Sequence, residues 1–302
     1  MKLTAVAPDL YLIPLDQDIP GFVDFIGSWV VKGPPTFLVD AGPAATVPRL
    51  LESLAQLDVQ HLDAILLTHI HIDHAGGLGD VIAHFPDTPV ICHPGAIKHL
   101  ADPTRLWEGS LKNLGAIARS YGPIRAVPAA LLQDATHYRE HGIRPLLTPG
   151  HAAHHVSYQF GPFLFAGETV GVHAGFDDGR VYLRPATPPR LFLETYLQSV
   201  DLILDTPHDV LCYGHYGITR RTPDLIRAHR RQILIWRDVV GRQMRQGQGE
   251  DFVDRCIERL LAEDDLMAAW DRFTPDVQER ERAFLTNSVR GFAEYLNRTD
   301  MP

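Results

Sequence analysis

Residues 65–80, with the sequence ILLTHIHIDHAGGLGD, constrain the fold of this 302-residue chain more than any other segment. The segment begins with a short apolar run, typical of a strand buried on both faces. Four potential metal ligands follow within six positions: His69, His71, Asp73 and His74. Two glycines come next and let the backbone turn sharply without placing bulky side chains near the ligands. A loop between a strand and a helix is where a rigid scaffold presents functional groups.

The spacing of these four side chains predicts a metal site. His69 and His71 stand two positions apart, so their imidazoles can converge on one cation, while Asp73 and His74 can turn toward a second. Imidazole and carboxylate ligands suit zinc, and they also suit iron or manganese. A single histidine at a strand end is more often structural, but four ligand-type residues at this spacing favour metal binding over a polar loop.

The segments around this loop predict antiparallel strands followed by alternating strands and helices. Residues 10–16, 22–31 and 36–42 are expected to form strands joined by tight turns, and residues 46–57 carry leucines at helical spacing. The other expected strands are short and mostly apolar: residues 63–69, 89–93, 143–150, 156–161, 162–168 and 209–215. Further helices are expected at residues 95–100, 105–122 and 188–204.

The strand signal stops near residue 220. Beyond it, apolar residues recur at helical spacing in three segments: residues 222–247, 250–264 and 274–298. No linker rich in glycine, serine or proline precedes these segments. We therefore expect a first domain at residues 1–220 and a helical C-terminal segment at residues 221–302, packed on the first domain or on a second subunit.

The composition is that of a globular protein. Hydrophobic residues make up 45% of the chain, charged residues make up 22%, and the three cysteines lie far apart with no CxxC spacing. No apolar stretch is long enough to cross a membrane, and the N-terminus lacks the pattern of a signal peptide, so we expect a cytoplasmic location. The net charge of −9 argues against a nucleic-acid partner, because nucleic acids are bound mainly through Lys and Arg.

Five motifs together carry a family resemblance. THIHIDHAGG, at residues 68–77, resembles the HxHxDH signature of the metallo-β-lactamase superfamily. Four other segments resemble further motifs of that superfamily in the expected order: LVDAG at 38–42, GHAAHH at 150–155, FAGET at 165–169 and YGHYG at 213–217. The resemblance covers residues 1 to about 220 and does not explain the C-terminal segment.

The resemblance implies an α+β fold, the αββα sandwich of the metallo-β-lactamase type, here with a C-terminal helical extension. Residues 1–220 would be the catalytic domain. A site for two divalent metal ions is also implied, with zinc expected and iron or manganese as alternatives. The implied ligands are His69, His71 and His151 for one ion, Asp73, His74 and His215 for the other, and a carboxylate of Glu168 that bridges them.

Three positions near this site need separate comment: Glu168, Gly171 and Asp40. The superfamily usually has aspartate where this chain has Glu168, whose extra methylene extends the carboxylate by about 1.5 Å. Lactonases of the superfamily often place a tyrosine three residues later, where this chain has Gly171, so the lactonase hypothesis loses one support. Asp40 is expected either to hold the ligand loop through hydrogen bonds or simply to end its strand.

The activity that the resemblance implies is hydrolysis of a small-molecule carbonyl ester, thioester or lactone through a metal-activated hydroxide. Asp73 is the expected catalytic residue, because it can orient the nucleophile and pass a proton to the leaving group. The expected partner is a small-molecule substrate, with no nucleic acid and no membrane. A homodimer contact through the C-terminal helices stays open.

Three other functions stay open. A mononuclear iron persulfide dioxygenase would use ligands of the His69, His71 and His151 type, but the complete second ligand set favours two metals. A nucleic-acid processing enzyme is disfavoured by the acidic chain, and a metal-stabilised, non-catalytic binding protein by the complete ligand set. Further candidates for the pocket, or for hydrogen bonds to the ligands, are His154, His155, His173 and Tyr216.

Overall fold

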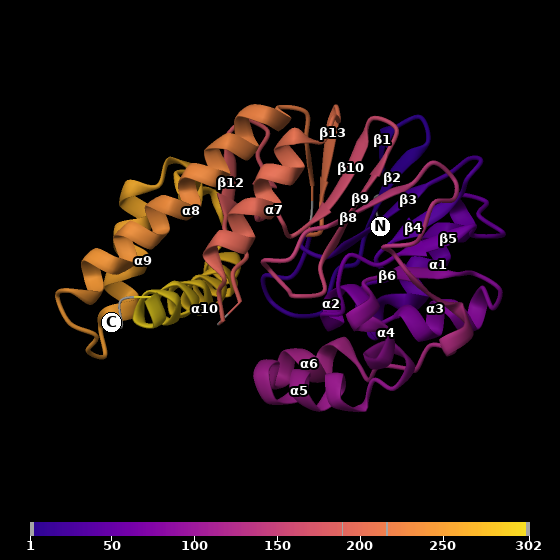
Figure 1. Ribbon diagram of the computed structural model, residues 1–302, viewed down its shortest axis with the longest axis horizontal. Coiled ribbons are helices and arrows are strands. Elements are labelled where there is room, and N and C mark those ends of the chain that lie inside the picture. Colours follow the sequence, from indigo (N-terminus) through magenta and orange to yellow (C-terminus); the bar gives the residue numbers. More distant parts are fainter. Residues whose placement is uncertain (1–2, 189, 216, 300–302) are drawn as a thin grey trace.

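Two facing β-sheets form the centre of the molecule, and helices cover the outer face of each sheet (Figure 1). The computed structural model describes residues 3–188, 190–215 and 217–299. Within these residues the first sheet has seven strands in sequence order: β1 (Thr4–Ala7), β2 (Leu10–Pro14), β3 (Gly27–Val31), β4 (Phe37–Val39), β5 (Ala64–Leu66), β6 (Val90–Cys92) and β7 (Leu132–Asp134). Strands β1 to β4 pair antiparallel, and β4 to β7 pair parallel.

The second sheet has five strands among the described residues. In spatial order they are β14 (Ile218–Thr219), β13 (Val210–Tyr213), β10 (Phe163–Gly167), β9 (Val156–Phe160) and β8 (Arg144–Leu147). Strands β10 and β13 pair parallel, and the other neighbours pair antiparallel. A separate antiparallel hairpin follows β10 and consists of β11 (Val172–Gly175) and β12 (Val181–Arg184).

Side chains of the first sheet alternate between two cores, as the period of a strand requires. In β4, Phe37 and Val39 point into the space between the sheets, where they share a core with Tyr158 and Phe165. Leu38 points the other way, into a core with the helices that cover the first sheet. Those helices are α1 (Val47–Gln56), α2 (Ile72–Ala75), α3 (Leu78–His84), α4 (Pro94–Ala101), α5 (Thr104–Leu114) and α6 (Ala116–Tyr121).

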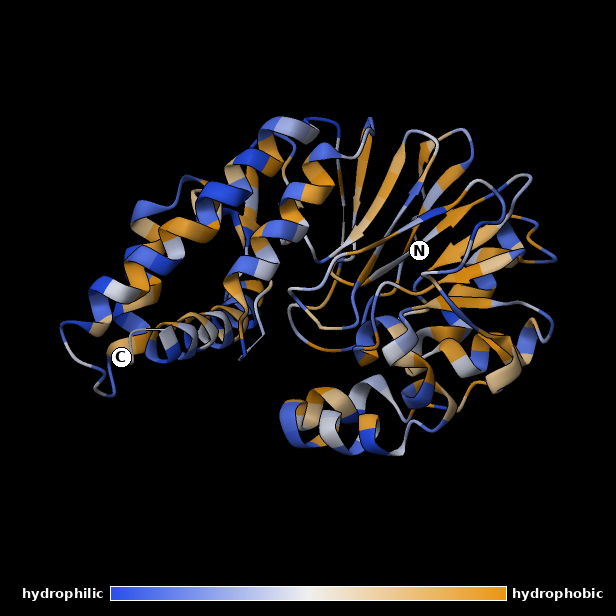
Figure 2. Ribbon diagram, viewed as in Figure 1, coloured by the Kyte–Doolittle hydropathy of each residue, from blue (hydrophilic) through white to orange (hydrophobic). Residues whose placement is uncertain are grey.

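Helix α7 and the three C-terminal helices of the described chain complete the outer layer of the second sheet. They are α7 (Leu193–Asp205), α8 (Thr222–Met244), α9 (Phe252–Glu263) and α10 (Pro275–Thr299), with short 3-10 turns at Asp265–Met267 and Trp270–Arg272. One core joins Leu164 and Leu211 of the sheet to Trp236 of α8 and Phe292 of α10. Figure 2 shows these helices with hydrophobic faces toward one another and hydrophilic faces outward.

Most of the predicted helices and strands form, and two of them have bounds that differ from the prediction. The strand expected over residues 22–31 begins only at Gly27, because Gly21 and Asp24 both take positive φ angles and turn the preceding chain into a loop. The helix expected over residues 105–122 is broken at Gly115, which also takes a positive φ. The layer order of helix, sheet, sheet and helix is the predicted one.

None of the helices in the described ranges is long and apolar enough to cross a membrane. The helical segment begins at Thr222, close to the predicted boundary near residue 220. The division into two domains stays a prediction, because the core that contains Trp236 continues across that boundary into the second sheet.

Candidate metal centre

The seven predicted metal ligands come from loops at the ends of strands in both sheets, and the fold brings them together. His69 and His71 follow β5, and the short helix α2 carries Asp73 and His74. The other three are His151 between β8 and β9, Glu168 directly after β10, and His215 shortly after β13. They form two groups, one with His69, His71, His151 and Glu168 and one with Asp73, His74 and His215, and the donor atoms of each group lie within 4.8 Å of one another.

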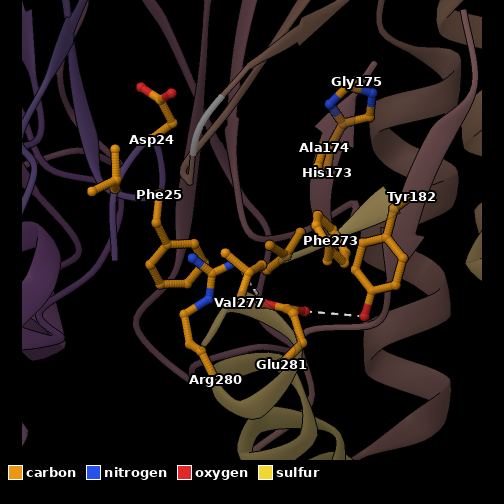
Figure 3. A pocket seen from close by; sticks show the side chains of 12 residues that line it. Asp24, Phe25, His173, Ala174, Gly175, Tyr182, Phe273, Val277, Arg280 and Glu281 are labelled. Atoms are coloured by element: carbon orange, nitrogen blue, oxygen red, sulfur yellow. Dashed lines mark hydrogen bonds and ion pairs between the residues drawn. The ribbon is translucent and has the colours of Figure 1, made fainter. Parts of the chain in front are cut away.

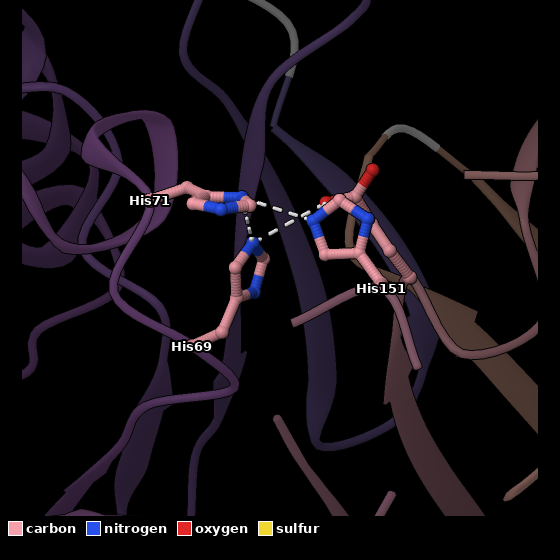
Figure 4. A group of neighbouring side chains, drawn as sticks. His69, His71 and His151 are labelled. Atoms are coloured by element: carbon pink, nitrogen blue, oxygen red, sulfur yellow. Dashed lines mark hydrogen bonds and ion pairs between the residues drawn. The ribbon is translucent and has the colours of Figure 1, made fainter. Parts of the chain in front are cut away.

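In the first group three imidazoles point at a common centre (Figure 4). His71 Nδ1 lies 3.0 Å from His69 Nε2 and 2.9 Å from His151 Nε2. Glu168 Oε2 lies 2.8 Å from His151 Nε2 and 3.3 Å from His69 Nε2. Two ligand atoms of a tetrahedral zinc ion are about 3.4 Å apart, so this group fits one ion after shifts of a few tenths of an ångström.

The second group is more open. Asp73 Oδ2 lies 3.9 Å from His74 Nε2 and 3.9 Å from His215 Nε2. His74 Nε2 is buried and has no hydrogen-bond partner in the described chain. A buried polar atom without a partner is costly. A cation held by Asp73, His74 and His215 would satisfy it, and the mixed nitrogen and oxygen donors suit a divalent metal.

Glu168 lies between the two groups. Its Oε2 atom faces the first group, and its Oε1 atom is 3.1 Å from His215 Nε2 in the second. The side chain is buried, so the longer carboxylate does reach the centre. The assignment of these seven residues as metal ligands, and of Glu168 as the bridge, is a proposal that their geometry supports.

Asp40 supports one histidine of each group. His74 Nδ1 donates to Asp40 Oδ2 at 2.9 Å, which leaves Nε2 free to face a metal. The hydroxyl of Thr68 donates to the same carboxylate at 2.8 Å, and Thr68 Oγ1 lies 3.1 Å from His69 Nδ1. Carboxylates that bond to histidines in this way orient metal ligands. Of the two roles expected for Asp40, the structure has the hydrogen-bonded one.

Three further bonds orient His151 and Glu168. His151 Nδ1 donates to the carbonyl of Ala186 at 2.9 Å. The backbone N–H of Glu168 donates to His155 Nε2 at 3.1 Å, and His155 Nδ1 bonds to the Thr148 hydroxyl at 2.9 Å. From the sequence, His155 is only one of several candidates for the pocket. Its position four residues after His151 does not reveal that it bonds to the backbone N–H of Glu168.

Burial and charge set the protonation of the centre before any metal binds. Burial lowers the pKa of His71 to about 3, so this imidazole is neutral and has a lone pair to offer. Burial acts on His74 in the same direction, but the carboxylates of Asp73 and Asp40 outweigh it and raise the pKa of His74 to about 9. Burial would raise the pKa of Glu168, yet His151 and His215 hold it well below its usual range.

A cavity of about 240 Å³ lies beside the centre, between the loop before β3, the hairpin β11–β12 and helix α10 (Figure 3). Its apolar walls include Phe25, Val172, Phe273 and Val277, and its polar walls include His173 and Arg280. Phe25 connects the cavity to the centre, because its ring stacks on the imidazole of His215 with 4.3 Å between centroids. The C-terminal segment therefore forms part of the wall.

The other candidate residues have separate positions. His154 lies at the edge of the first group, with its ring centroid 6.1 Å from that of His71, and burial lowers its pKa to about 4. His173 lines the cavity and stacks on Tyr213. Tyr216 lies outside the described residues.

Comparison with known proteins identifies the family. The sequence model of the metallo-beta-lactamase superfamily matches residues 23–215. A metallo-beta-lactamase fold-containing protein of Sulfurisphaera tokodaii is 30% identical over 211 residues, which are 66% of this chain and 74% of that protein. A hydroxyacylglutathione hydrolase of Aeromonas hydrophila is 32% identical over 188 residues, but these are only 60% of this chain and 57% of the relative.

Solved structures agree on the fold. A metallo-beta-lactamase family protein of Thermus thermophilus superimposes with a TM-score of 0.64 at 22% identity and covers 98% of this chain and 95% of its own. This likeness confirms the predicted αββα architecture with its C-terminal helices. With the two ligand groups, the family match supports the predicted enzyme class, a metal-dependent hydrolase.

Proposed function

The chain belongs to the metallo-β-lactamase superfamily, and we propose that it is a binuclear metal hydrolase of a small-molecule carbonyl ester, thioester or lactone. The observation that carries this proposal is the convergence of seven donor side chains, from loops of both sheets, into two groups that share Glu168. A protein that only needed a structural metal would have no use for the second, more open group, because structural sites are closed by their four ligands.

Two divalent ions, with zinc expected and iron or manganese as alternatives, would supply a nucleophile from water at neutral pH and polarise the substrate carbonyl. His69, His71 and His151 would hold one ion, and Asp73, His74 and His215 the other. The chain's own part is to turn the imidazoles correctly and to shield them from bulk water. The bonds from His74 to Asp40 and from His151 to Ala186 support that part.

Asp73 is the residue we propose for proton transfer. Its side chain is 19% exposed, whereas the side chains of its neighbours His74 and His215 are 1% and 5% exposed. Asp73 can therefore meet both the buried centre and an incoming substrate. From that position its carboxylate can orient the attacking water and pass a proton to the leaving group.

The cavity beside His215 is the proposed place for the part of the substrate that does not react. Its walls combine apolar side chains with polar and charged ones, the latter being Asp24, His173, Tyr182, Arg280 and Glu281. Ligand pockets commonly combine an apolar lining with a small number of polar groups that fix orientation. The site therefore suits a small molecule with an apolar or aromatic portion better than a nucleic acid, in agreement with the net charge of −9.

Relatives named hydroxyacylglutathione hydrolase support an acyl substrate over a phosphodiester. The mononuclear iron dioxygenase remains the second candidate, because the first group alone offers three histidines. The two functions differ in the second group. The hydrolase needs a second metal ion held by Asp73, His74 and His215, whereas the dioxygenase needs only one iron, in the first group.

A screen of purified protein over esters, thioesters, lactones and phosphodiesters tests the proposed function. We expect metal-dependent hydrolysis of at least one carbonyl substrate, with turnover above that of every phosphodiester. Faster cleavage of an RNA or another phosphodiester would overturn the substrate class. Oxygen consumption with a persulfide, together with one iron per chain, would establish the dioxygenase instead.

A further inference from the structure

His215 differs from the other histidines of the centre in how its ring is held. Its Nε2 atom faces Glu168 and Asp73, as a metal ligand should. Its Nδ1 atom is buried and has no hydrogen-bond partner among the described residues, unlike Nδ1 of His74 and of His151. Metal-binding histidines almost always donate their second ring N–H to an acceptor that fixes the ring. Something else must set the orientation of this imidazole.

Phe25 occupies the face of the His215 ring. The two rings are nearly parallel, at an interplanar angle of 15° and a centroid distance of 4.3 Å. The backbones are also joined, because Ile26 and His215 form an antiparallel bridge between the two sheets. Phe25 is therefore fixed next to His215 by its backbone as well as by its ring, and a turn of the imidazole out of its plane would break the stack.

Arg280 of α10 covers the opposite face of Phe25. Its guanidinium carbon lies 3.9 Å from the centroid of the Phe25 ring, well within the range of a cation–π contact. The guanidinium is held in its plane by Glu281 Oε1, at 3.0 Å from Nη2 and 3.2 Å from Nε, and by the carbonyl of Gly21. Figure 3 shows Arg280 lying over the Phe25 ring.

Glu281 is anchored in turn by the hairpin. Its Oε2 atom accepts from Arg184 Nε at 2.5 Å and from the Tyr182 hydroxyl at 3.0 Å, and all these side chains are buried. A buried, fully bonded network of this kind is rigid, because breaking one bond leaves an unpaired charge. Bonds to α10 and to strand β12 therefore hold Arg280 in place over Phe25, and Phe25 is stacked on His215.

We propose that Phe25 and Arg280 are positioning residues for His215, and that through them α10 sets the affinity of the second metal group without supplying a ligand. The stack restrains the plane of the ring, which is part of what a hydrogen bond to Nδ1 does elsewhere in the centre. It holds the ring in the plane in which Nε2 faces Glu168 and Asp73. This inference rests on the second metal of the proposed function.

Cobalt titration of metal-stripped protein separates this role from ordinary packing. Cobalt bound at the two groups is followed by its visible absorption, and the two binding constants are measured for wild type, Phe25→Leu, Phe25→Tyr and Arg280→Lys. Phe273→Leu is the matched control, because Phe273 lines the same cavity and packs against Tyr182 but is not stacked on His215. Melting temperatures record the stability of each variant.

We expect Phe25→Leu to weaken the second cobalt equivalent by about 10- to 100-fold and to alter its spectrum, with the first equivalent unchanged. Phe25→Tyr keeps an aromatic face and should restore most of that affinity. Arg280→Lys keeps the charge without the planar stack and should fall between wild type and Phe25→Leu. The control should bind both equivalents as wild type does, even if it melts earlier.

Four results would overturn the inference. Phe25→Leu could bind both equivalents with wild-type affinity, or it could lose both in parallel with Phe273→Leu, which would reduce the stack to packing. If Phe25→Leu does not fold, Arg280→Lys with an unaltered second equivalent decides against the inference. A wild-type protein that takes up no second equivalent would contradict both this inference and the binuclear site.

Discussion

At the scale of single residues, Glu168 decides whether the two groups form one centre. One carboxylate oxygen lies 2.8 Å from His151 and the other lies 3.1 Å from His215, so a single side chain contacts both groups. The buried position would be costly for an unpaired carboxylate. The imidazoles of His151 and His215 lower its pKa and keep it charged.

Substitution of Glu168 tests this role. Glu168→Gln removes the negative charge while keeping the length of the side chain, so it should weaken the second metal first and lower the metal-dependent rate. Glu168→Asp restores the commoner carboxylate length and should keep part of the binding. Metal stoichiometry and rate are measured across the three proteins. Full stoichiometry, affinity and rate in Glu168→Gln would mean that Glu168 is no ligand.

Asp40 offers a second test at this scale, because it bonds to His74 directly and contacts His69 through Thr68. Asp40→Asn should weaken binding of both metals by about 10- to 100-fold, the usual effect of losing a carboxylate behind a ligand. Asp63→Asn is the control, since Asp63 also binds a backbone N–H and a histidine but lies away from the centre. Equal metal affinities for both variants would contradict the role of Asp40.

The sequence predicts those site residues whose type and spacing alone indicate metal binding. His69, His71, Asp73 and His74 follow one strand at ligand spacing, and the remaining three lie in recognisable motifs. The role of Asp40 could not be decided, since an aspartate at a strand end has the same sequence signature whether or not it bonds to a histidine. The sequence predicts only a strand at Phe25. Its contact with His215 could not be predicted, because stacking on a residue 190 positions away leaves no local sequence pattern.

At the scale of secondary-structure elements, α8 joins helix α7 and the hairpin β11–β12 through a buried polar contact. His229 of α8 donates from Nδ1 to Gln232 at 2.8 Å, and its Nε2 lies 3.2 Å from the Tyr196 hydroxyl of α7. Gln232 donates to the carbonyl of Leu183 in β12 and to Asp264. Every polar atom of the His229 ring is therefore paired while the ring is neutral.

This environment makes the attachment of α8 sensitive to acid. Burial lowers the pKa of His229 to about 4, below the ordinary value of 6.5, although the bond to Gln232 acts in the opposite direction. Between pH 6.5 and about 4 the unfolded chain binds a proton here that the folded chain does not, so the free energy of unfolding falls as the pH falls through that window. The loss is about 3 kcal/mol at most.

Denaturant unfolding of wild type and His229→Gln at pH 8 and at pH 4.5 measures this effect. The variant should start less stable at pH 8 and lose less on acidification, because it has no proton to take up at this position. The comparison removes the contributions of metal release and of the other buried histidines, which both proteins share. Parallel losses in the two proteins would contradict the account of His229.

Element prediction succeeded where a short apolar run or a helical stripe was strong, as in β5 and α8. It failed for the hairpin β11–β12 and for β1, β7 and β14, which no strand prediction covered. The hairpin strand Val181–Arg184 contains a buried arginine, and its burial depends on Glu281 nearly 100 residues later. Local composition cannot anticipate a strand that is stabilised by such a distant partner.

At the scale of the whole molecule, the C-terminal helices share a core with the second sheet. Trp236 and Phe292 are fully buried against residues such as Leu211 and Tyr213. A chain ending at Arg220 would expose this surface, and we expect it to be insoluble or to melt far below the full chain. A truncated protein with unchanged melting and full activity would show that the helices form an independent unit.

Within the full chain, Phe292→Ala should lower the free energy of unfolding by about 3–5 kcal/mol, as other buried Phe→Ala changes do. Phe192→Ala is the control, because Phe192 is an exposed phenylalanine in the same region, and its loss should cost about 1 kcal/mol or less. Equal effects would contradict a shared core.

The central claim is that this protein is a hydrolase whose activity needs two metal ions per chain. Elemental analysis of protein purified without added metal, followed by chelation and stepwise return of metal while hydrolysis is monitored, tests it most directly. We expect up to two equivalents of a divalent transition metal, activity that is complete only after the second equivalent, and loss of most activity and at least one equivalent in His69→Ala. Hydrolysis by a protein that contains no transition metal would contradict the account.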